Sequence, residues 1–520
     1  MMKNKKLRNA LFTLLPMTFA SAMLVSAPAS AAVTGMQFGD LEKGSVMVWA
    51  RSDHSGRMMI QYATNSKFTG ARIIRGPYAL ENTDYTAKQE LRALPLGANV
   101  YVKVWFEDLT NARTRSAAVV GHFHTIANTE NIRFAWGADT AGQGYGINTA
   151  FGGMKIYEAI RQAKPQFFIH SGDTIYADSV IPPSITTSAA EGGVVWTNLV
   201  TPEVSKVAET LDEFRGRYKY NFLDANVQAF NKEVPQIWQW DDHEVVNNWS
   251  NSKDLSADAR YTVKDVPLLT ARAATAFNEY SAQRPHDFTA PGRIYRKISY
   301  GPLLDVFVVD MRSYRGANGM NNETTESAAT AFLGNTQVAW LLSELRKSKA
   351  TWKVIAADQP LSVNINDVFP TPVGAQPTWE AIANGNNGVA LGRELELARL
   401  LKGIKTANVK NIVWLTGDVH YAGAYQYDPT KAASSDFNGF WEFIAGPLNA
   451  GSFGGYTIDG TFGAQEVFKK QPPAGQANLS PYAGLQFFGE VNIDNISKVM
   501  TVNLKDINGV SVFSQPLTPQ

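Results

Sequence analysis

The chain has 520 residues and almost balanced charge, with 48 Lys and Arg against 47 Asp and Glu and a formal net charge of +1. This length predicts two or three domains, and the lack of a long basic tract argues against an extended footprint for nucleic acid or for an acidic membrane. The sequence has no cysteine, which excludes disulfides and thiolate metal ligands.

Residues 1–31 have the pattern of a secretory signal peptide. Basic residues at positions 3, 5, 6 and 8 precede a mostly apolar run over 10–25, and Ala29-Ser30-Ala31 has the small-x-small pattern of a cleavage site. No later segment sustains about 20 apolar residues, so we expect no transmembrane anchor. The mature protein is expected to begin close to Ala32 and to be periplasmic or otherwise secreted.

Residues 32–127 show short stretches in which apolar and polar residues alternate. The clearest are 44–52, 57–64, 99–108 and 118–126, and turn-rich pieces separate them. This pattern predicts a small antiparallel β-sandwich. His122 and His124, two apart on one strand, could bind a metal from one face, but no acidic partner is evident nearby in the sequence, and a structural or solvated pair is favoured.

From residue 128 onward, strand patterns alternate with amphipathic helix patterns, which predicts an α/β layer fold. Helices are expected at 154–164, 207–223, 268–283, 336–348 and 393–405. Strands are expected at 132–138, at 166–173, before residue 241, as a pair over 294–312, at 352–360 and at 411–418, and then without intervening helices at 440–448, 485–494, 498–504 and 510–517. Two long loops, 179–205 and 364–392, are expected to be functional lids or insertions.

Four of the predicted strands end in polar clusters. The clusters are Asp139, Asp173, the run 241–243, and Asp418 with His420. In open α/β sheets, ligands bind beyond the carboxyl ends of strands, so these side chains can converge although they are distant in sequence. An Asp that only caps a turn would explain any one of these clusters, but it explains all four poorly.

The candidate ligands are mainly oxygen atoms. Carboxylates come from Asp139, Asp173, Asp242 and Asp418. Further oxygen atoms could come from Asn247, Asn248 and Tyr176. Only His243 and His420 supply nitrogen, since His170 and His286 are interpreted as structural. Such a set favours hard ions such as Ca²⁺, Mn²⁺ or Fe³⁺ over a His-rich zinc site. Two ions that share carboxylates would suit attack of a hydroxide on phosphorus.

Four motifs in this order resemble the alkaline phosphatase D family of calcineurin-like metallophosphoesterases. They are GDTIY (172–176), WDDHEVVNN (240–248), DMRSYR (310–315) and GDVH (417–420). The resemblance implies an immunoglobulin-like β-sandwich at 32–127. It also implies a catalytic α/β sandwich of mixed sheets flanked by helices at 128–520, with a multinuclear metal centre.

The resemblance also assigns roles to individual residues. Asp173 would bridge metals and Tyr176 would ligate iron, while Asp242, Asn248, Asp418 and His420 would ligate the neighbouring ions. His243 would face the phosphate, and Arg312 or Arg315 would contact it. Many relatives have a cysteine ligand where this chain has Asp139, so an aspartate takes the place of a thiolate. We expect two or more ions, calcium together with iron or manganese.

The expected activity is that of a secreted, metal-dependent phosphoesterase that hydrolyses phosphate monoesters, diesters or both by attack of metal-activated water. One alternative is a phosphodiesterase or phospholipase that acts on polymers or lipids of the cell envelope. Another is a protein that binds a phosphorylated polymer without turnover. The intact set of Asp242, His243, Asp418 and His420 favours an enzyme.

Overall fold

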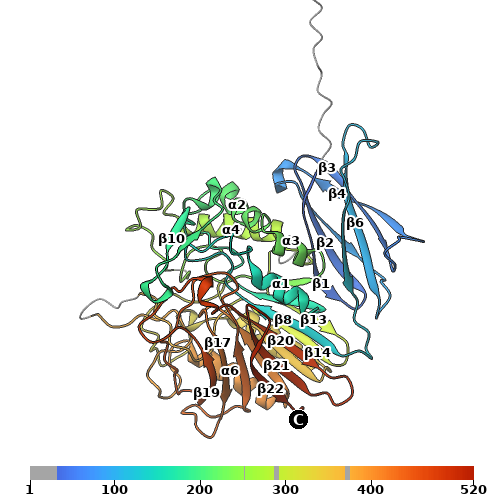
Figure 1. Cartoon of the computed structure of the whole chain (residues 1–520). Coiled ribbons are helices and arrows are strands. Elements are labelled where there is room, and N and C mark those ends of the chain that lie inside the picture. Colours follow the sequence, from blue (N-terminus) through green and yellow to red (C-terminus); the bar gives the residue numbers. More distant parts are fainter. Residues whose placement is uncertain (1–31, 251, 286–291, 369–374) are drawn as a thin grey trace, which may run out of the picture.

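The computed structural model describes residues 32–250, 252–285, 292–368 and 375–520 (Figure 1). The predicted signal peptide and His286 lie outside the described residues. Within the described part of the chain, no helix is long and apolar enough to cross a membrane.

Seven N-terminal strands form two sheets around one apolar core, as the alternating pattern predicted. They are β1 (Val33–Glu42), β2 (Ser45–Ser52), β3 (Gly56–Ala63), β4 (Arg72–Ala79), β5 (Thr86–Leu91), β6 (Asn99–Asp108) and β7 (Val119–His124). One sheet has the order β4-β3-β6-β7, and β1, β2 and β5 face it. Side chains such as Val48, Ile60 and Val102 fill the space between the sheets with almost no solvent exposure. The immunoglobulin-like description of this sandwich stays a prediction.

The sandwich is continuous with the sheet of the second half of the chain. Strand β1 pairs in parallel with β12 (Gln236–Gln239), where Gly39 lies opposite Gln236. The resulting nine-stranded sheet has the order β22-β21-β20-β8-β9-β12-β1-β2-β5. Its other members are β8 (Ile132–Gly137), β9 (Phe167–Ser171), β20 (Phe487–Ile493), β21 (Met500–Asp506) and β22 (Ser511–Leu517). A single β-sheet therefore contains strands from both sides of the predicted domain boundary at residue 127.

A seven-stranded sheet packs against the central strands of the nine-stranded sheet. Its order is β13-β14-β15-β16-β18-β17-β19. The strands are β13 (Arg296–Tyr300), β14 (Leu304–Val308), β15 (Trp352–Ala356), β16 (Ile412–Thr416), β17 (Ala422–Tyr427), β18 (Phe440–Ile444) and β19 (Ala464–Lys470). Phe134 and Ile169 from one sheet meet Val306 and Val354 from the other in one buried cluster. This contact forms the central layer of the molecule.

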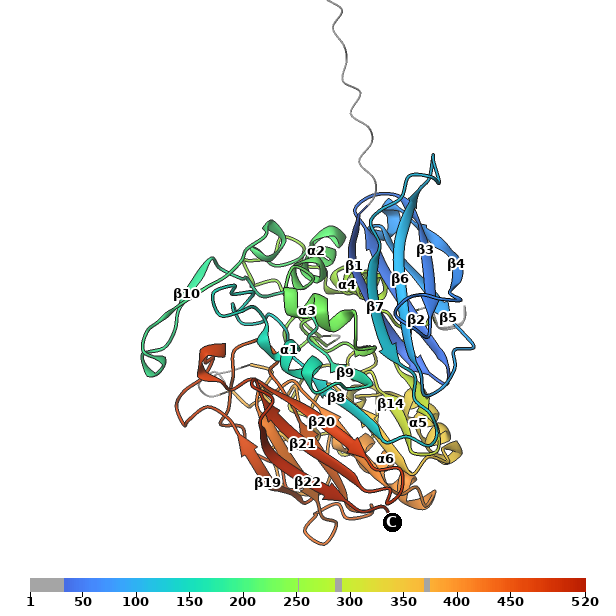
Figure 2. The same cartoon turned by 45° about the vertical axis from the view of Figure 1, so that its right-hand side comes forward.

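Helices cover the outer faces of both sheets (Figures 1 and 2). They are α1 (Lys155–Gln162), α2 (Leu211–Asn221), α3 (Ala225–Asn231) and α4 (Val266–Tyr280) on the nine-stranded sheet, and α5 (Asn335–Lys347) and α6 (Glu394–Thr406) on the seven-stranded sheet. Short 3₁₀ turns lie at Glu81–Thr83, Ala189–Glu191, Pro202–Val204, Ala328–Thr330 and Pro481–Ala483. The predicted architecture of mixed sheets flanked by helices is confirmed.

The structure contains several elements that the sequence pattern did not predict, among them strands β1, β4, β5 and β17. The long loop 179–205 contains a small hairpin of β10 (Ser184–Thr186) and β11 (Val195–Thr197), and α3 and β19 lacked a clear signal. Strand β19 is an edge strand with partly exposed, mostly polar residues, so it lacks the apolar run of a central strand. Helix α3 has only seven residues, too few for a clear periodicity.

Candidate metal centre

Aspartates occupy the same place after six parallel strands. Each lies two residues beyond a strand end, and the six strands are β8, β9 and β12 of one sheet and β14, β15 and β16 of the other. The residues are Asp139, Asp173, Asp241, Asp310, Asp358 and Asp418. Because the two sheets pack face to face, these ends form one polar layer above the central core. The convergence expected from the sequence is therefore present.

Several of these residues have a backbone conformation that side chains other than glycine seldom adopt. Asp139, Asp173 and Asp418 have φ angles of 70°, 52° and 69°, and Asn248 and His420 have φ angles of 56° and 58°. Left-handed backbone at residues with a Cβ costs free energy and persists where the surrounding structure enforces it, often at functional sites. Five of the candidate site residues share this property.

The predicted ligands form three overlapping groups whose ligand atoms lie within 4.8 Å of one another. The groups are Asp139, Asp173 and His420; Asp173, Asp242 and His243; and Asp241, Asp242 and Asp418. Asp173 belongs to the first and second groups and Asp242 to the second and third. The hydroxyl of Tyr176 lies 2.9 Å from Nε2 of His420, so the predicted phenol is also at the centre.

Some carboxylate oxygens of this centre have no hydrogen-bond donor among the described residues. Both carboxylate oxygens of Asp139 and Oδ1 of Asp242 are buried without a hydrogen bond among the described residues. Burial, followed by repulsion from neighbouring carboxylates, raises the pKa values of Asp139, Asp173 and Asp418 well above their usual range. Ionised carboxylates packed in this way require cations. The oxygen-rich donor set therefore fits hard metal ions.

His420 and Asn248 are each fixed by a hydrogen bond that leaves one ligand atom available. Nδ1 of His420 donates to the carbonyl of Gly451 at 2.5 Å, so Nε2 carries the lone pair. Burial lowers the pKa of His420 to about 4, which keeps the ring neutral. The side-chain amide of Asn248 donates to the carbonyl of Asp367 at 2.7 Å, so Oδ1 is its free acceptor atom. Outer hydrogen bonds of this kind orient metal ligands.

His243 lies at the edge of the same cluster and is held by a carboxylate. Its Nδ1 is 2.7 Å from Oδ1 of Asp178, and its side chain is 12% exposed. Burial opposes the charged ring, but Asp178 and Asp242 outweigh it and raise the pKa of His243 to about 9. Asp178 is itself fixed by the backbone N–H of Asn247, at 2.8 Å. His243 can therefore carry a proton on Nε2 while Nδ1 is held by Asp178.

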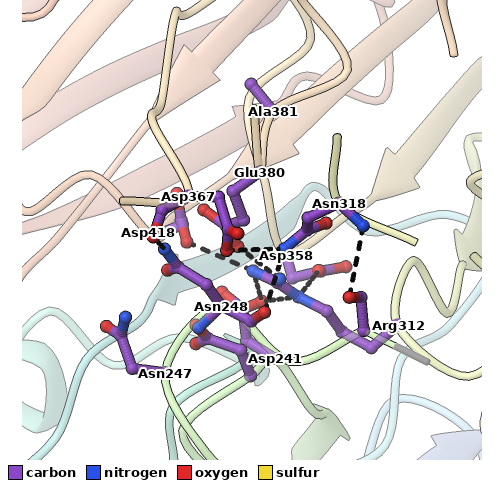
Figure 3. A network of polar contacts seen from close by, with 12 residues as sticks. Asp241, Asn247, Asn248, Arg312, Asn318, Asp358, Asp367, Glu380, Ala381 and Asp418 are labelled. Atoms are coloured by element: carbon purple, nitrogen blue, oxygen red, sulfur yellow. Dashed lines mark hydrogen bonds and ion pairs between the residues drawn. The ribbon is translucent and has the colours of Figure 1, made fainter. Parts of the chain in front are cut away.

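Arg312, which was predicted to contact phosphate, is enclosed by carboxylates (Figure 3). Its guanidinium has no solvent exposure, lies 2.5 Å from Asp241 and 3.4 Å from both Asp358 and Asp418, and forms an ion pair with Glu380. Arg315 is also buried, 4.0 Å from Glu380. The donors of Arg312 are thus directed at protein carboxylates, and its predicted contact with phosphate stays a prediction.

Sequence reasoning missed three acidic residues of this region. Asp358 follows β15 within ADQP (357–360), which has the strand-then-Asp pattern of the other sites and could have been found from it. Asp178 lies two residues after the GDTIY motif, and Glu380 comes from the long loop 364–392, where no local pattern marks it. Asp358 and Glu380 share Arg312, and Asp178 holds His243.

Glu244 and Asp310 hold the backbone of this region in place. Glu244 accepts hydrogen bonds from the backbone N–H groups of Asp173, Thr174 and Asp241, so it ties the loop after β9 to the loop after β12. Asp310 accepts from the backbone N–H of Arg312.

The histidines set aside as structural have protein partners. His170 is buried, and its Nε2 is 3.0 Å from the hydroxyl of Thr140. His122 stacks on Tyr101. His124 lies 3.1 Å from Glu130, so the sequence-based statement that no acidic partner is nearby was wrong.

Comparisons with known proteins agree with this geometry. The family model described as PhoD-like phosphatase matches residues 134–504, and the model of the PhoD-like phosphatase N-terminal domain matches residues 20–127. Alkaline phosphatase D of Bacillus subtilis (strain 168) is 26% identical over 359 residues, which cover 66% of this chain and 55% of that protein. The chain thus spans about half the length of this curated relative.

Two solved structures share the fold. A structure of PhoD matches with a TM-score of 0.65 and 20% identity, over 93% of this chain and 88% of that one. The purple acid phosphatase PPD1 from seeds of yellow lupin (Lupinus luteus) matches with a TM-score of 0.56 and 12% identity, over 94% and 74% of the two chains. At these identities the matches show the fold alone, whereas the family model covers most of the chain. The chain belongs to the PhoD-like phosphatase family.

Proposed function

We propose that the protein is an exported, metal-dependent phosphoesterase that hydrolyses phosphate monoesters, diesters or both. The observation that carries this proposal is the buried carboxylate cluster around Asp139, whose two carboxylate oxygens accept no hydrogen bond among the described residues. Such a cluster is stable at neutral pH only with bound cations. Membership of a phosphatase family supplies the substrate class.

The residues that would hold the ions are those predicted from the sequence. They are Asp139, Asp173, Tyr176, Asp242, Asn248, Asp418 and His420, and we propose two or more ions, calcium together with iron or manganese. When bound, such ions supply a hydroxide at neutral pH and offset charge on the phosphate oxygens. Asp139 offers oxygen where many relatives have sulfur, which favours harder ions at this position.

His243 is proposed as the group that contacts the phosphate ester and protonates the departing oxygen. Asp178 holds Nδ1 of His243, so Nε2 carries the proton that can be donated. Arg312 acts from behind the ligands, because it pairs with Asp241 and Asp418 and partly neutralises them. It therefore keeps the carboxylates in place, and its predicted contact with phosphate stays a prediction.

Export is proposed from the sequence pattern of residues 1–31, with a mature chain that starts close to Ala32. N-terminal sequencing of exported protein checks this. A start within the apolar run 10–25 would contradict it. We also propose that residues 32–127 are an immunoglobulin-like sandwich and that 128–520 carry the catalytic centre.

The test of the proposed activity compares turnover of a nitrophenyl phosphate monoester and diester by wild type and Asp418→Asn. We expect the variant to lose more than about 100-fold in kcat/KM, because even residues that only orient metal ligands cost 10–100-fold. The control is Asp436→Asn, which should retain full activity. Asp436 is exposed and pairs with Lys402 and Lys405 of α6. Equal activity of wild type and Asp418→Asn, or wild-type binding of phosphate esters without turnover, would overturn the proposal.

A further inference from the structure

The outer face of the four-stranded sheet β4-β3-β6-β7 carries aromatic and cationic side chains in ordered rows. Antiparallel partners that lie directly opposite each other project from the same face of a sheet. The register therefore defines three rows: Tyr78, Arg57 and Glu107; Arg75, Met59 and Trp105; and Ile73, Gln61, Lys103 and Val120; while Tyr101 and His122 form a further pair. The alternate residues, such as Ile60 and Val102, face the core of the sandwich.

Several of these side chains are strongly exposed although they are large and apolar. Ile73 is 60% exposed, Tyr78 54% and Val120 47%. Large apolar side chains grouped on one sheet face mark a surface that contacts a ligand or partner. In both overall views this sheet lies at the end of the molecule opposite strands β19 and β22 (Figures 1 and 2). It therefore forms a surface separate from the metal centre.

The cations on this face lie against aromatic rings. Arg57 is centred 5.0 Å from the ring of Tyr78, and Nζ of Lys103 is 3.9 Å from the ring of Phe68, in the loop after β3. Arg75 is exposed between these two pairs, opposite Met59. The rows defined above hold three permanent cations and one carboxylate, Glu107. The face is thus complementary to an anionic ligand.

We propose that this face, from Ile73 and Tyr78 to Val120, is a docking surface for an anionic polysaccharide. The exposed ring of Tyr78 offers apolar surface to the face of a sugar ring, while Arg57, Arg75 and Lys103 pair with the negative groups of the chain. Four extended strands offer a long surface that suits a linear polymer rather than a small molecule. This occupant uses both features of the face, its aromatic rings and its excess of cations.

A lipid bilayer fits this face less well. Insertion into a membrane requires a continuous apolar surface, whereas Ile73, Tyr78 and Val120 belong to different rows or opposite edges of the sheet. Gln61 and Lys103 lie between Ile73 and Val120 in the same row. The apolar side chains are therefore interleaved with polar ones.

The consequence for catalysis rests on the proposed function. A polymer that carries phosphate esters and docks on this sheet would be held at high local concentration near the metal centre. Docking itself requires no turnover, so binding and hydrolysis are measured separately.

The experiment measures binding of the mature chain to phosphorylated dextran and to unmodified dextran of the same length. We expect binding to phosphorylated dextran to be salt-dependent and the double variant Arg75→Ala/Lys103→Ala to bind it at least ten-fold more weakly. The control is Arg72→Ala. Arg72 is exposed on β4, the strand of Arg75, but it lies opposite Tyr62, which packs toward the core, so it is not part of the outer face. Arg72→Ala should bind like wild type, and all variants should hydrolyse a nitrophenyl phosphate at the wild-type rate.

Melting curves verify that the variants are folded. If the double variant is not folded, the single substitution Arg75→Glu on the exposed edge strand β4 serves as a second test.

Wild-type binding by the variants of Arg75 and Lys103, or an equal loss of binding in Arg72→Ala, would overturn the proposal. Preferential binding to vesicles of anionic phospholipid over phosphorylated dextran would also overturn it and would identify a membrane surface. If the wild-type protein binds phosphorylated dextran but does not hydrolyse the nitrophenyl phosphate, the proposed function is contradicted and the docking proposal is not.

Discussion

Single residues of the centre are held in conformations that are costly without a ligand. Asp139 combines a φ angle of 70° with two buried carboxylate oxygens that have no hydrogen bond among the described residues. Neither feature stabilises the fold by itself. The structure around Asp139 therefore enforces a costly arrangement, which the proposed binding of a cation would stabilise.

This leads to a prediction about Asp139→Asn that depends on metal and pH. The folded-state pKa of Asp139 is raised far above the value of about 4 expected in the unfolded chain. In metal-free protein its contribution to stability is therefore present below about pH 4 and is lost as the pH rises toward the folded-state pKa. With chelator present, Asp139→Asn should melt above wild type at neutral pH, and the difference should shrink at acidic pH.

With metal added, the order should reverse, because the variant lacks a charged ligand and wild type gains the free energy of metal binding. Thermal unfolding of both proteins at several pH values, with and without chelator, measures this. An unchanged order of melting temperatures would show that Asp139 does not hold a cation.

A second prediction at this scale separates His243 from the metal ligands. His243→Ala should retain metal but lose roughly 100- to 10,000-fold in kcat/KM on esters of weakly acidic alcohols. Nitrophenyl esters need little protonation of the departing oxygen, so their loss should be much smaller. Asp178→Asn should show the same dependence on the leaving group, but its loss in kcat/KM should be only roughly 10- to 100-fold, because Asp178 only orients the ring of His243.

The measurement is kcat/KM across leaving groups of graded pKa, with metal content determined in parallel. If His243 only binds the phosphate electrostatically, His243→Ala will lower kcat/KM by the same factor for all esters. The slope of kcat/KM against leaving-group pKa will then equal that of wild type.

Between elements, the loops after parallel strands are linked by buried side chains. Glu244, after β12, accepts from the backbone of residues 173 and 174, after β9, and so fixes the distance between two candidate ligand loops. Arg393, at the start of α6, donates to the carbonyls of Trp379, Glu380 and Ala381 and thereby positions the part of the long loop that supplies Glu380. Both contacts place functional side chains indirectly, through the backbone.

We predict that Glu244→Ala lowers the free energy of unfolding by about 3 kcal/mol or more, because three buried N–H groups lose their acceptor. It should also weaken metal binding, since the loops of Asp173 and Asp241 are no longer tied together. The matched control is Glu209→Ala, since Glu209 also accepts from backbone N–H groups, those of Thr262 and Val263, but from none in these two loops. Denaturant unfolding and metal titration distinguish the two, and equal metal affinity in both variants would contradict the role of Glu244.

At the scale of the whole molecule, the N-terminal sandwich and the C-terminal part of the chain share a sheet and a buried ion pair. Asp40 of β1 lies 2.8 Å from Arg296 of β13, and both side chains are almost fully buried. Arg284 adds a further contact, since its backbone N–H donates to Asp40. Trp49 of β2 packs among residues of α2 and α4. These contacts predict that the two halves unfold together.

Removal of Asp40 tests this coupling. Asp40→Ala leaves Arg296 buried without its carboxylate and should cost roughly 3–5 kcal/mol. The loss should appear in a single cooperative transition for the whole chain. Asp436→Asn, which breaks exposed ion pairs with Lys402 and Lys405, should cause no measurable change. Two separate transitions in calorimetry, with only one shifted by Asp40→Ala, would contradict the coupling.

The sequence by itself determined the class of the fold and most of its elements. Strands β2, β3, β6 and β7 and five of the six helices lie where the periodicity predicted them, because alternation and helical spacing are local properties of buried faces. Edge strand β19 and short helix α3 were missed because neither has an apolar pattern of its own. The aspartates after four strands likewise predicted one composite site, since parallel strands bring their carboxyl ends to the same edge.

Tertiary structure alone decided how the charges in that site are distributed. The sequence could not show that Arg312 is enclosed by Asp241, Asp358, Glu380 and Asp418, because these partners come from separate strands and a long loop. It also could not show that β1 joins the nine-stranded sheet beside β12, since strand pairing between distant segments has no local signal. Local periodicity fixes which face of an element is buried, whereas ion pairs and sheet neighbours depend on which elements the packing brings together.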